Sequence, residues 1–187
     1  ADAVVSQTLL TLLLLMAVGL QKLLMQWCCS SAAAAAVADG SGNASAADAA
    51  ARQGARAGIF THIGCDPAGD GLLELWHGEG IETHLVKRCV DAQTGIYFVT
   101  HDTDGHHFSY YRKMSAAANM QASDVPADQL ASASMLHVSG ISQAISKSAS
   151  AAVLAAIDAV KAAGGRVSYD TNLRLGLWSL EEARATI

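Results

Sequence analysis

Three residues near the middle of the sequence combine groups that suit a charged ligand. Tyr110, Tyr111 and Arg112 end an apolar and aromatic run, and a similar run occupies residues 95–100. Side chains alternate along a strand, so Tyr110 and Arg112 would share one face while Tyr111 points the other way. Arg binds carboxylates or phosphates with paired hydrogen bonds, and a Tyr hydroxyl binds other hydroxyls. The pair suits a polyhydroxylated anion, the alternative being packed tyrosines beside a solvated Arg.

A β-hairpin is the element that must position these side chains. The turn-forming sequence Asp102-Thr103-Asp104-Gly105 separates the two aromatic runs, which is typical of a hairpin. His106 and His107 follow the turn and could suggest a metal site. Adjacent histidines on a strand point to opposite faces and make a poor chelate, so we expect a solvated hairpin tip and no metal site.

A second polar cluster follows a predicted buried strand at residues 166–172. Asp170 and Asn172 lie at its carboxyl end, and Arg174 comes next. Ligands of open α/β sheets bind at the carboxyl ends of the strands, so the cluster is a second candidate binding site. The alternative is a polar helix start whose side chains only cap and hydrate the backbone.

Strand and helix patterns alternate along the chain, which indicates an α/β fold. Before the last strand, we predict strands in the second half of residues 55–64 and at 135–141. We predict an Ala-rich helix that ends at Gln53, a helix at about 71–79 with Asp70 as its N-cap, a helix at 146–163, and the start of another at 177–187. Short strands from Ile81 to Cys89 and the hairpin follow one another without a helix. We therefore expect a small inserted β-element at about 81–112.

The first 38 residues differ in texture from the rest. Residues 9–20 are nearly all apolar, and residues 30–36 are a low-complexity run of Ser and Ala. A transmembrane helix would need about 20 apolar residues, and a signal peptide would need basic residues before the apolar run. We favour a third interpretation, in which residues 1–38 lie outside the fold and a partial domain covers 39–187.

Composition excludes several classes of function. The formal net charge of -5 and the pI of about 5.7 argue against a nucleic-acid-binding surface. The four cysteines, Cys28, Cys29, Cys65 and Cys89, form neither a zinc pattern nor a disulfide framework. We expect reduced thiols, a cytoplasmic location and a small-molecule ligand, with no membrane partner.

Four motifs in order resemble the PfkB (ribokinase-like) carbohydrate kinase family, and within it the 2-keto-3-deoxygluconate kinases. They are the Gly/Asn loop at 40–45, Ile63-Gly64-x-Asp66-x-x-Gly69, Tyr110-Tyr111-Arg112 with Ser115-Ala116-Ala117, and Asp170-x-Asn172-x-Arg174 with Leu177-Trp178. The resemblance covers about residue 40 to the end. It implies a ribokinase-like three-layer α/β/α sandwich with a small β-sheet lid, truncated at the C-terminal side.

The resemblance also implies an activity and a set of contacts. Such kinases transfer the γ-phosphoryl group of ATP, with Mg²⁺, to a sugar hydroxyl, and their lids can pair between protomers. By motif, the sugar acid, most closely 2-keto-3-deoxygluconate, would contact Gly40, Tyr97, Tyr110 and Arg112, with Arg112 facing its carboxylate. Asn172 and Arg174 would lie where substrate and nucleotide phosphates meet.

Two departures from the family pattern limit the prediction. The sugar loop reads roughly Gly-Gly-x-x-x-Asn in the family, which leaves either Asn43 or Ser45 at the Asn position. The family's catalytic Gly-Ala-Gly-Asp does not follow Arg174, and the lookalike at 67–70 precedes the lid. We therefore assign no catalytic residue and expect an incomplete kinase that binds sugar weakly, or a non-catalytic sugar-binding or subunit-interaction module.

Overall fold

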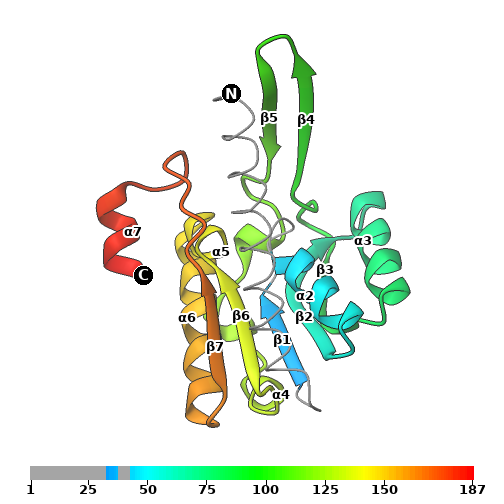
Figure 1. The fold of residues 1–187 in the computed structure, drawn as a ribbon, viewed down its shortest axis with the longest axis vertical. Helices are drawn as coiled ribbons and strands as arrows, with labels where there is room; N and C mark the ends of the chain where they lie inside the picture. Colours follow the sequence, from blue (N-terminus) through cyan, green and yellow to red (C-terminus); the bar gives the residue numbers. More distant parts are fainter. Residues whose placement is uncertain (1–32, 38–42) are drawn as a thin grey trace, which may run out of the picture.

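The structure, a computed structural model, describes residues 33–37 and 43–187 (Figure 1). Its centre is a five-stranded sheet in which every neighbouring pair is parallel. In spatial order the strands are β3 (Glu82–Cys89), β2 (Arg56–Gly64), β1 (Ala33–Val37), β6 (Met135–Ser139) and β7 (Arg166–Asp170). Parallel strands need crossover connections, and helices supply them here.

Helices cover both faces of the sheet. They are α2 (Asn43–Arg52), α3 (Pro67–Gly78), α4 (Ala127–Leu130), α5 (Gly140–Ala144), α6 (Lys147–Ala162) and α7 (Leu180–Thr186), with short 3₁₀ turns η1 (Ala117–Asn119) and η2 (Ala122–Asp124). On one face, α6 packs against Leu136 and Val138 of β6. On the other, α2 and α3 enclose Ile59 and Ile63 of β2. The predicted three-layer α/β/α arrangement is therefore confirmed.

Helix α6 shows how the sequence determines one of these layers. Ser146 caps its first turn by accepting a hydrogen bond from the Ala149 backbone N–H at 3.0 Å. Its buried residues recur at helical spacing and are Ala149, Ala152, Val153, Ala156 and Val160. This narrow stripe of small side chains lets the helix lie close to the sheet. Gly164, at φ +84°, ends the helix as the sequence predicted.

The hairpin is an antiparallel pair of strands, β4 (Ile96–Asp102) and β5 (Gly105–Tyr111). It extends away from the sheet, beyond the carboxyl ends of the central strands (Figure 1). Every residue of both strands is exposed. Asp102 Oδ1 accepts a hydrogen bond from the Asp104 N–H at 2.8 Å, which closes the predicted turn.

Two predicted boundaries are corrected by the sheet. The inserted β-element was placed at 81–112, but β3 pairs in parallel with β2 at the edge of the main sheet, so only β4 and β5 form the separate hairpin. Residues 1–38 were placed outside the fold, but β1 lies at the centre of the sheet between β2 and β6. The fold therefore includes residues 33–37.

No helix in the described ranges is both long and apolar enough to cross a membrane. Residues 9–20, for which membrane and secretion interpretations were weighed, lie outside those ranges.

Candidate functional site

The hairpin is anchored to the carboxyl end of β2 through one carboxylate. Asp66 Oδ1 accepts from the Gly69 N–H at 2.8 Å, and its Oδ2 accepts from the Thr94 N–H at 2.7 Å. The Thr94 side chain adds a hydrogen bond to β2, in which its Oγ1 accepts from the Gly64 N–H at 2.9 Å. Asp66 thus caps α3 and also holds the residue that leads into β4. Burial would raise the pKa of Asp66, but the hydrogen bonds from Thr94 and Gly69 outweigh it and hold that pKa below its usual value.

This anchor explains both glycines of the Ile63-Gly64-x-Asp66-x-x-Gly69 motif. A Cβ on Gly64 would lie 2.2 Å from Asp66 Oδ2 and 2.7 Å from the Thr94 nitrogen. A Cβ on Gly69 would lie 2.4 Å from the Gly64 carbonyl oxygen. The sequence assigned the α3 cap to Asp70, which is wrong: α3 begins at Pro67, and Asp70 forms a 2.6 Å ion pair with Arg88.

The hairpin gathers three of the predicted site residues on one face. Tyr97 and Tyr110 are cross-strand partners, with ring centroids 5.9 Å apart. The Arg112 guanidinium lies 4.4 Å from the centre of the Tyr110 ring. Tyr111 contacts Phe98 instead, and Phe98 pairs with Ser109 on the opposite face. The predicted alternation of Tyr110 and Arg112 against Tyr111 is therefore confirmed.

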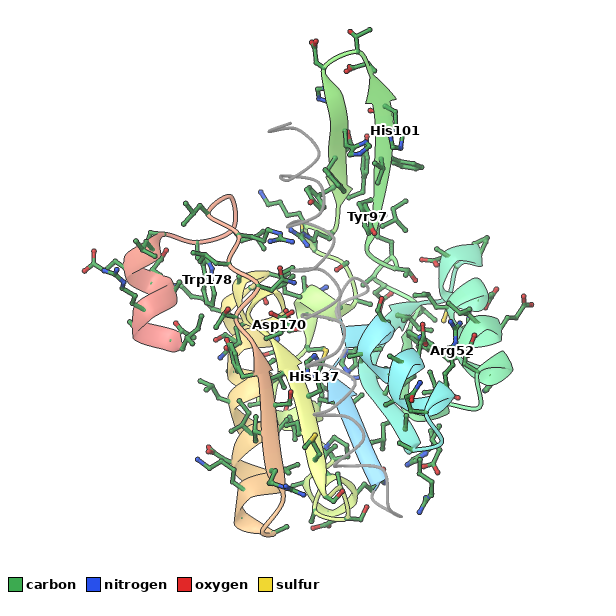
Figure 2. All side chains as sticks on the ribbon, in the orientation of Figure 1. Arg52, Tyr97, His101, His137, Asp170 and Trp178 are labelled. Atoms are coloured by element: carbon green, nitrogen blue, oxygen red, sulfur yellow. The ribbon has the colours of Figure 1, made fainter. Side chains whose placement is uncertain are left out.

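The loop between β7 and α7 carries the other predicted residues. Figure 2 shows Asp170 at the end of β7 and Trp178 further along this loop. The Asn172 N–H donates to Asp170 Oδ1 at 3.1 Å, and Asn172 adopts a left-handed backbone with φ +32°. Asn tolerates this region better than most residues. Arg174 is exposed, and its guanidinium donates to the neighbouring Leu173 carbonyl at 3.3 Å.

This loop rests on the start of α5. A Cβ on Gly140 would lie 2.3 Å from the Thr171 carbonyl oxygen and 3.5 Å from the Trp178 ring, so glycine permits a close approach there. Tyr169 of β7 donates its hydroxyl hydrogen to Gln143 Oε1. Gln143 is 3% exposed, and its Nε2 finds no hydrogen-bond partner within the described ranges. These contacts fix the end of β7 against α5.

A charged network ties the turn η2, which follows the hairpin, to the sheet. Asp124 accepts from Lys87 Nζ at 2.9 Å and lies 3.8 Å from His62 Nε2. His62 is buried in β2, and burial lowers its pKa, opposed by Asp124 and assisted by Lys87. Because Asp124 contacts β2 and β3 together, it fixes the chain segment that leaves the hairpin.

The predicted site residues therefore fall into two groups. Tyr97, Tyr110 and Arg112 come together on the hairpin, whereas Asn172 and Arg174 lie in the loop after β7. Gly40 lies outside the described residues. Ser45 is exposed in the first turn of α2, which begins at Asn43. The sequence interpretation missed the anchor between Asp66 and Thr94, although an Asp immediately before Pro67 is a signal for a helix start.

Metal binding by three or more ligands finds no support in the described part of the chain. No group of three or more His, Cys, Asp or Glu residues there could hold an ion. The carboxylates nearest the candidate site already accept hydrogen bonds from the backbone, Asp66 from Thr94 and Asp170 from Asn172. These residues do not by themselves fit a Mg²⁺ site.

Comparison with known proteins identifies the family. Residues 32–187 match the pfkB family of carbohydrate kinases. A 2-dehydro-3-deoxygluconokinase from Thermoproteus tenax is 36% identical over 148 residues, which cover 74% of this chain and 43% of that protein. The "Probable fructokinase-4" of Arabidopsis thaliana is 35% identical over 152 residues, which cover 80% of this chain and 46% of that protein. The chain thus spans less than half of the length of either relative.

The crystal structure of a PfkB protein from Polaromonas sp. JS666 has the same fold. It superposes with a TM-score of 0.75 at 31% sequence identity, over 84% of this chain and 61% of that one. The predicted ribokinase-like α/β/α fold is therefore confirmed. With the sequence match over residues 32–187, the conclusion is that this chain belongs to the pfkB family of carbohydrate kinases.

Proposed function

We propose that this chain provides the sugar-binding side of an ATP-dependent kinase whose substrate is a sugar acid, most closely 2-keto-3-deoxygluconate. One observation carries the proposal: Arg112 stacks on Tyr110, on the hairpin face that also presents Tyr97. Among the described residues, Arg112 forms no ion pair, so its guanidinium is available to an anion. We propose that this hairpin acts as a lid over the sugar.

The chemistry of this face matches an acidic sugar. The guanidinium offers paired donors to a carboxylate, and the phenol groups exchange hydrogen bonds with sugar hydroxyls. Stacking on Tyr110 restricts the Arg112 side chain, so less freedom is lost when it binds. A neutral ketose such as fructose would use the tyrosines but leave Arg112 without a partner. Since relatives include both 2-dehydro-3-deoxygluconokinases and fructokinases, Arg112 is the residue that favours the acid.

The loop after β7 is proposed as the place where ATP phosphates approach. Arg174 is exposed and, among described residues, free of ion pairs, which fits a phosphate contact. The Asn172 amide, held by its unusual backbone, could bind a neighbouring phosphate or sugar oxygen. ATP, when bound, would supply the phosphoryl group that is transferred. We propose Mg²⁺ only as the ion that accompanies ATP in this family, with no ligand assigned to it in this chain.

The roles proposed for this chain are binding and orientation. Its 187 residues contain no Gly-Ala-Gly-Asp sequence, so no catalytic base is assigned among them. We propose that the hairpin face orients the sugar acid and that the β7 loop receives the phosphate charge. We propose a cytoplasmic location for this activity, with no nucleic acid or membrane partner.

A second proposed role is subunit contact through the hairpin. The face opposite Arg112 exposes Phe98 at 55% and Tyr111 at 55%, and the rings contact each other edge to face. Aromatic groups exposed to this extent on a protruding ribbon would be covered by a second copy of the chain. Phe98→Ser should then shift the sedimentation coefficient from dimer to monomer. A monomer in the wild-type protein would exclude this role.

A titration separates sugar binding from a purely structural hairpin. We expect 2-keto-3-deoxygluconate to shift the NMR signals of residues 96–112, and Tyr110→Phe to weaken binding. Tyr111→Phe is the matched control, because it removes the same hydroxyl from the opposite face. Assays of ATP-dependent phosphorylation of 2-keto-3-deoxygluconate, fructose and ribose then rank the substrates. Equal effects of the two Tyr variants would contradict the proposed sugar face.

A further inference from the structure

Two histidines face each other across the hairpin near its tip. His101 and His106 are cross-strand partners, with ring centroids 4.4 Å apart. Their Nδ1 atoms are 2.6 Å apart, and both side chains are exposed. Figure 2 labels His101 on the hairpin, further from the sheet than Tyr97. The hairpin therefore brings two exposed imidazole nitrogens into direct contact with each other.

His107, the next residue along β5, has different partners. His107 pairs with Thr100 across the hairpin, and its Nε2 lies 2.9 Å from Asp102 Oδ2. Adjacent strand residues point to opposite faces, so His107 cannot join the pair formed by His106 and His101. His106 and His107 thus lie on opposite faces, whereas strand register brings His101 opposite His106.

We infer that His101 and His106 form a two-ligand site for a divalent transition-metal ion such as Ni²⁺, Cu²⁺ or Zn²⁺. Neutral imidazole is a preferred ligand of these ions, whereas Mg²⁺ prefers oxygen. Metal–nitrogen bonds of about 2.0–2.1 Å place two ligands at a right angle roughly 2.9 Å apart. The observed Nδ1–Nδ1 separation of 2.6 Å must widen slightly, and both rings, which are exposed, must turn so that their lone pairs point at the ion.

The metal ion would take the place of the hydrogen atom that lies between the two Nδ1 atoms. At 2.6 Å, one Nδ1–H donates to the lone pair of the other Nδ1. To bind metal, both Nδ1 atoms must present lone pairs, so the donor ring moves its hydrogen to Nε2 and no net proton is released. The other coordination positions belong to water, in keeping with the absence of any group of three or more metal-ligating residues in the described chain.

Such an ion would link the two strands of the hairpin. Within the described residues, β4 and β5 form a two-stranded sheet of their own. An isolated two-stranded ribbon is marginally stable in water. A bond through the metal between His101 and His106 adds a cross-strand contact near the turn. The bound ion should therefore slow amide hydrogen exchange in β4 and β5 and leave exchange in α6 unchanged.

The test is a titration of the full, tag-free chain with Ni²⁺ alone, followed by calorimetry and by the ¹⁵N shifts of the imidazole nitrogens. We expect His101→Gln and His106→Gln each to bind one Ni²⁺ fewer per chain than the wild type. His107→Gln is the matched control and should retain the wild-type stoichiometry. All variants keep the same cysteines, so binding to thiols cancels in the comparison, and excess Mg²⁺ should not compete.

Three results would overturn the site. Wild-type stoichiometry in either His101→Gln or His106→Gln would show that the ion is held elsewhere. An equal loss in His107→Gln would show that the ion does not select the cross-strand pair. Unchanged Nδ1 shifts in the wild-type protein would exclude direct ligation. Because the substituted side chains are exposed, circular dichroism of each variant should match the wild type.

Discussion

Substitution of Gly64 by Ala tests the anchor at the base of the hairpin. The added Cβ would lie 2.2 Å from Asp66 Oδ2, 2.7 Å from the Thr94 nitrogen and 2.9 Å from the Ala92 carbonyl oxygen. Two of these three atoms belong to the backbone and cannot move aside, and the third, Asp66 Oδ2, is held in place by its hydrogen bond from the Thr94 N–H. Relief of the overlap must separate Asp66 from Thr94, which breaks the 2.7 Å hydrogen bond between them.

The expected magnitude follows from two contributions. Overpacking a tight site costs about 1–3 kcal/mol, and loss of a hydrogen bond to a charged group costs about 1.5–3 kcal/mol. Because the two effects are alternative ways of relieving one clash, we expect a total of about 2–4 kcal/mol rather than their full sum. With a urea dependence of about 2 kcal/mol per molar, the unfolding midpoint should fall by roughly 1–2 M.

The matched control is Gly71→Ala in α3. No atom lies within 4 Å of a Cβ built at Gly71. Alanine there should stabilise the helix by about 0.4–1 kcal/mol, which raises the urea midpoint slightly. If Gly64→Ala unfolded at the wild-type midpoint, the crowding at the hairpin anchor would be absent in solution and the reasoning would be refuted.

Three further predictions concern stability. Asp66→Ala removes the α3 cap and the bond to Thr94 and should lower the free energy of unfolding by about 2–3 kcal/mol in urea titrations; an unchanged midpoint would argue against the anchor. The pKa of His62 is lowered by burial, so the unfolded state takes up protons first and stability should fall as pH drops through about 6.5. His62→Gln should flatten that fall in thermal melts at pH 5.5 to 7.5. Tyr169→Phe leaves Gln143 Oε1 without its donor and should cost about 1–3 kcal/mol, a loss that equal denaturation curves would disprove.

The sequence predicted the elements whose local signals agree with their tertiary setting. Helix α6 has a Ser cap, a periodic apolar stripe and a glycine stop, and it lies within one or two residues of its predicted ends. The hairpin was predicted from its turn, and the shared face of Tyr110 and Arg112 followed from strand alternation. In these cases a few neighbouring residues contain the necessary information.

Prediction from the sequence was wrong where the pairing of distant strands decides the structure. Ala33–Val37 is a run of helix-favouring alanines, yet it forms the central strand because β2 and β6 flank it on both sides. Strand β3 resembled part of the hairpin element because no helix separates them, but α3 before it provides the crossover for parallel pairing with β2. The contact between His101 and His106 likewise depends on strand register, which no single run of sequence reveals.

The most direct measurement compares two sugars on two proteins. Calorimetric titration of 2-keto-3-deoxygluconate and of fructose into the wild-type chain and Arg112→Ala isolates the interaction between the guanidinium and a carboxylate. We expect Arg112→Ala to weaken binding of the acid by about 1.5–3 kcal/mol, roughly tenfold to a hundredfold in Kd, and to leave fructose binding unchanged. Equal loss for both sugars, or no loss for the acid, would contradict a carboxylate-binding role for Arg112.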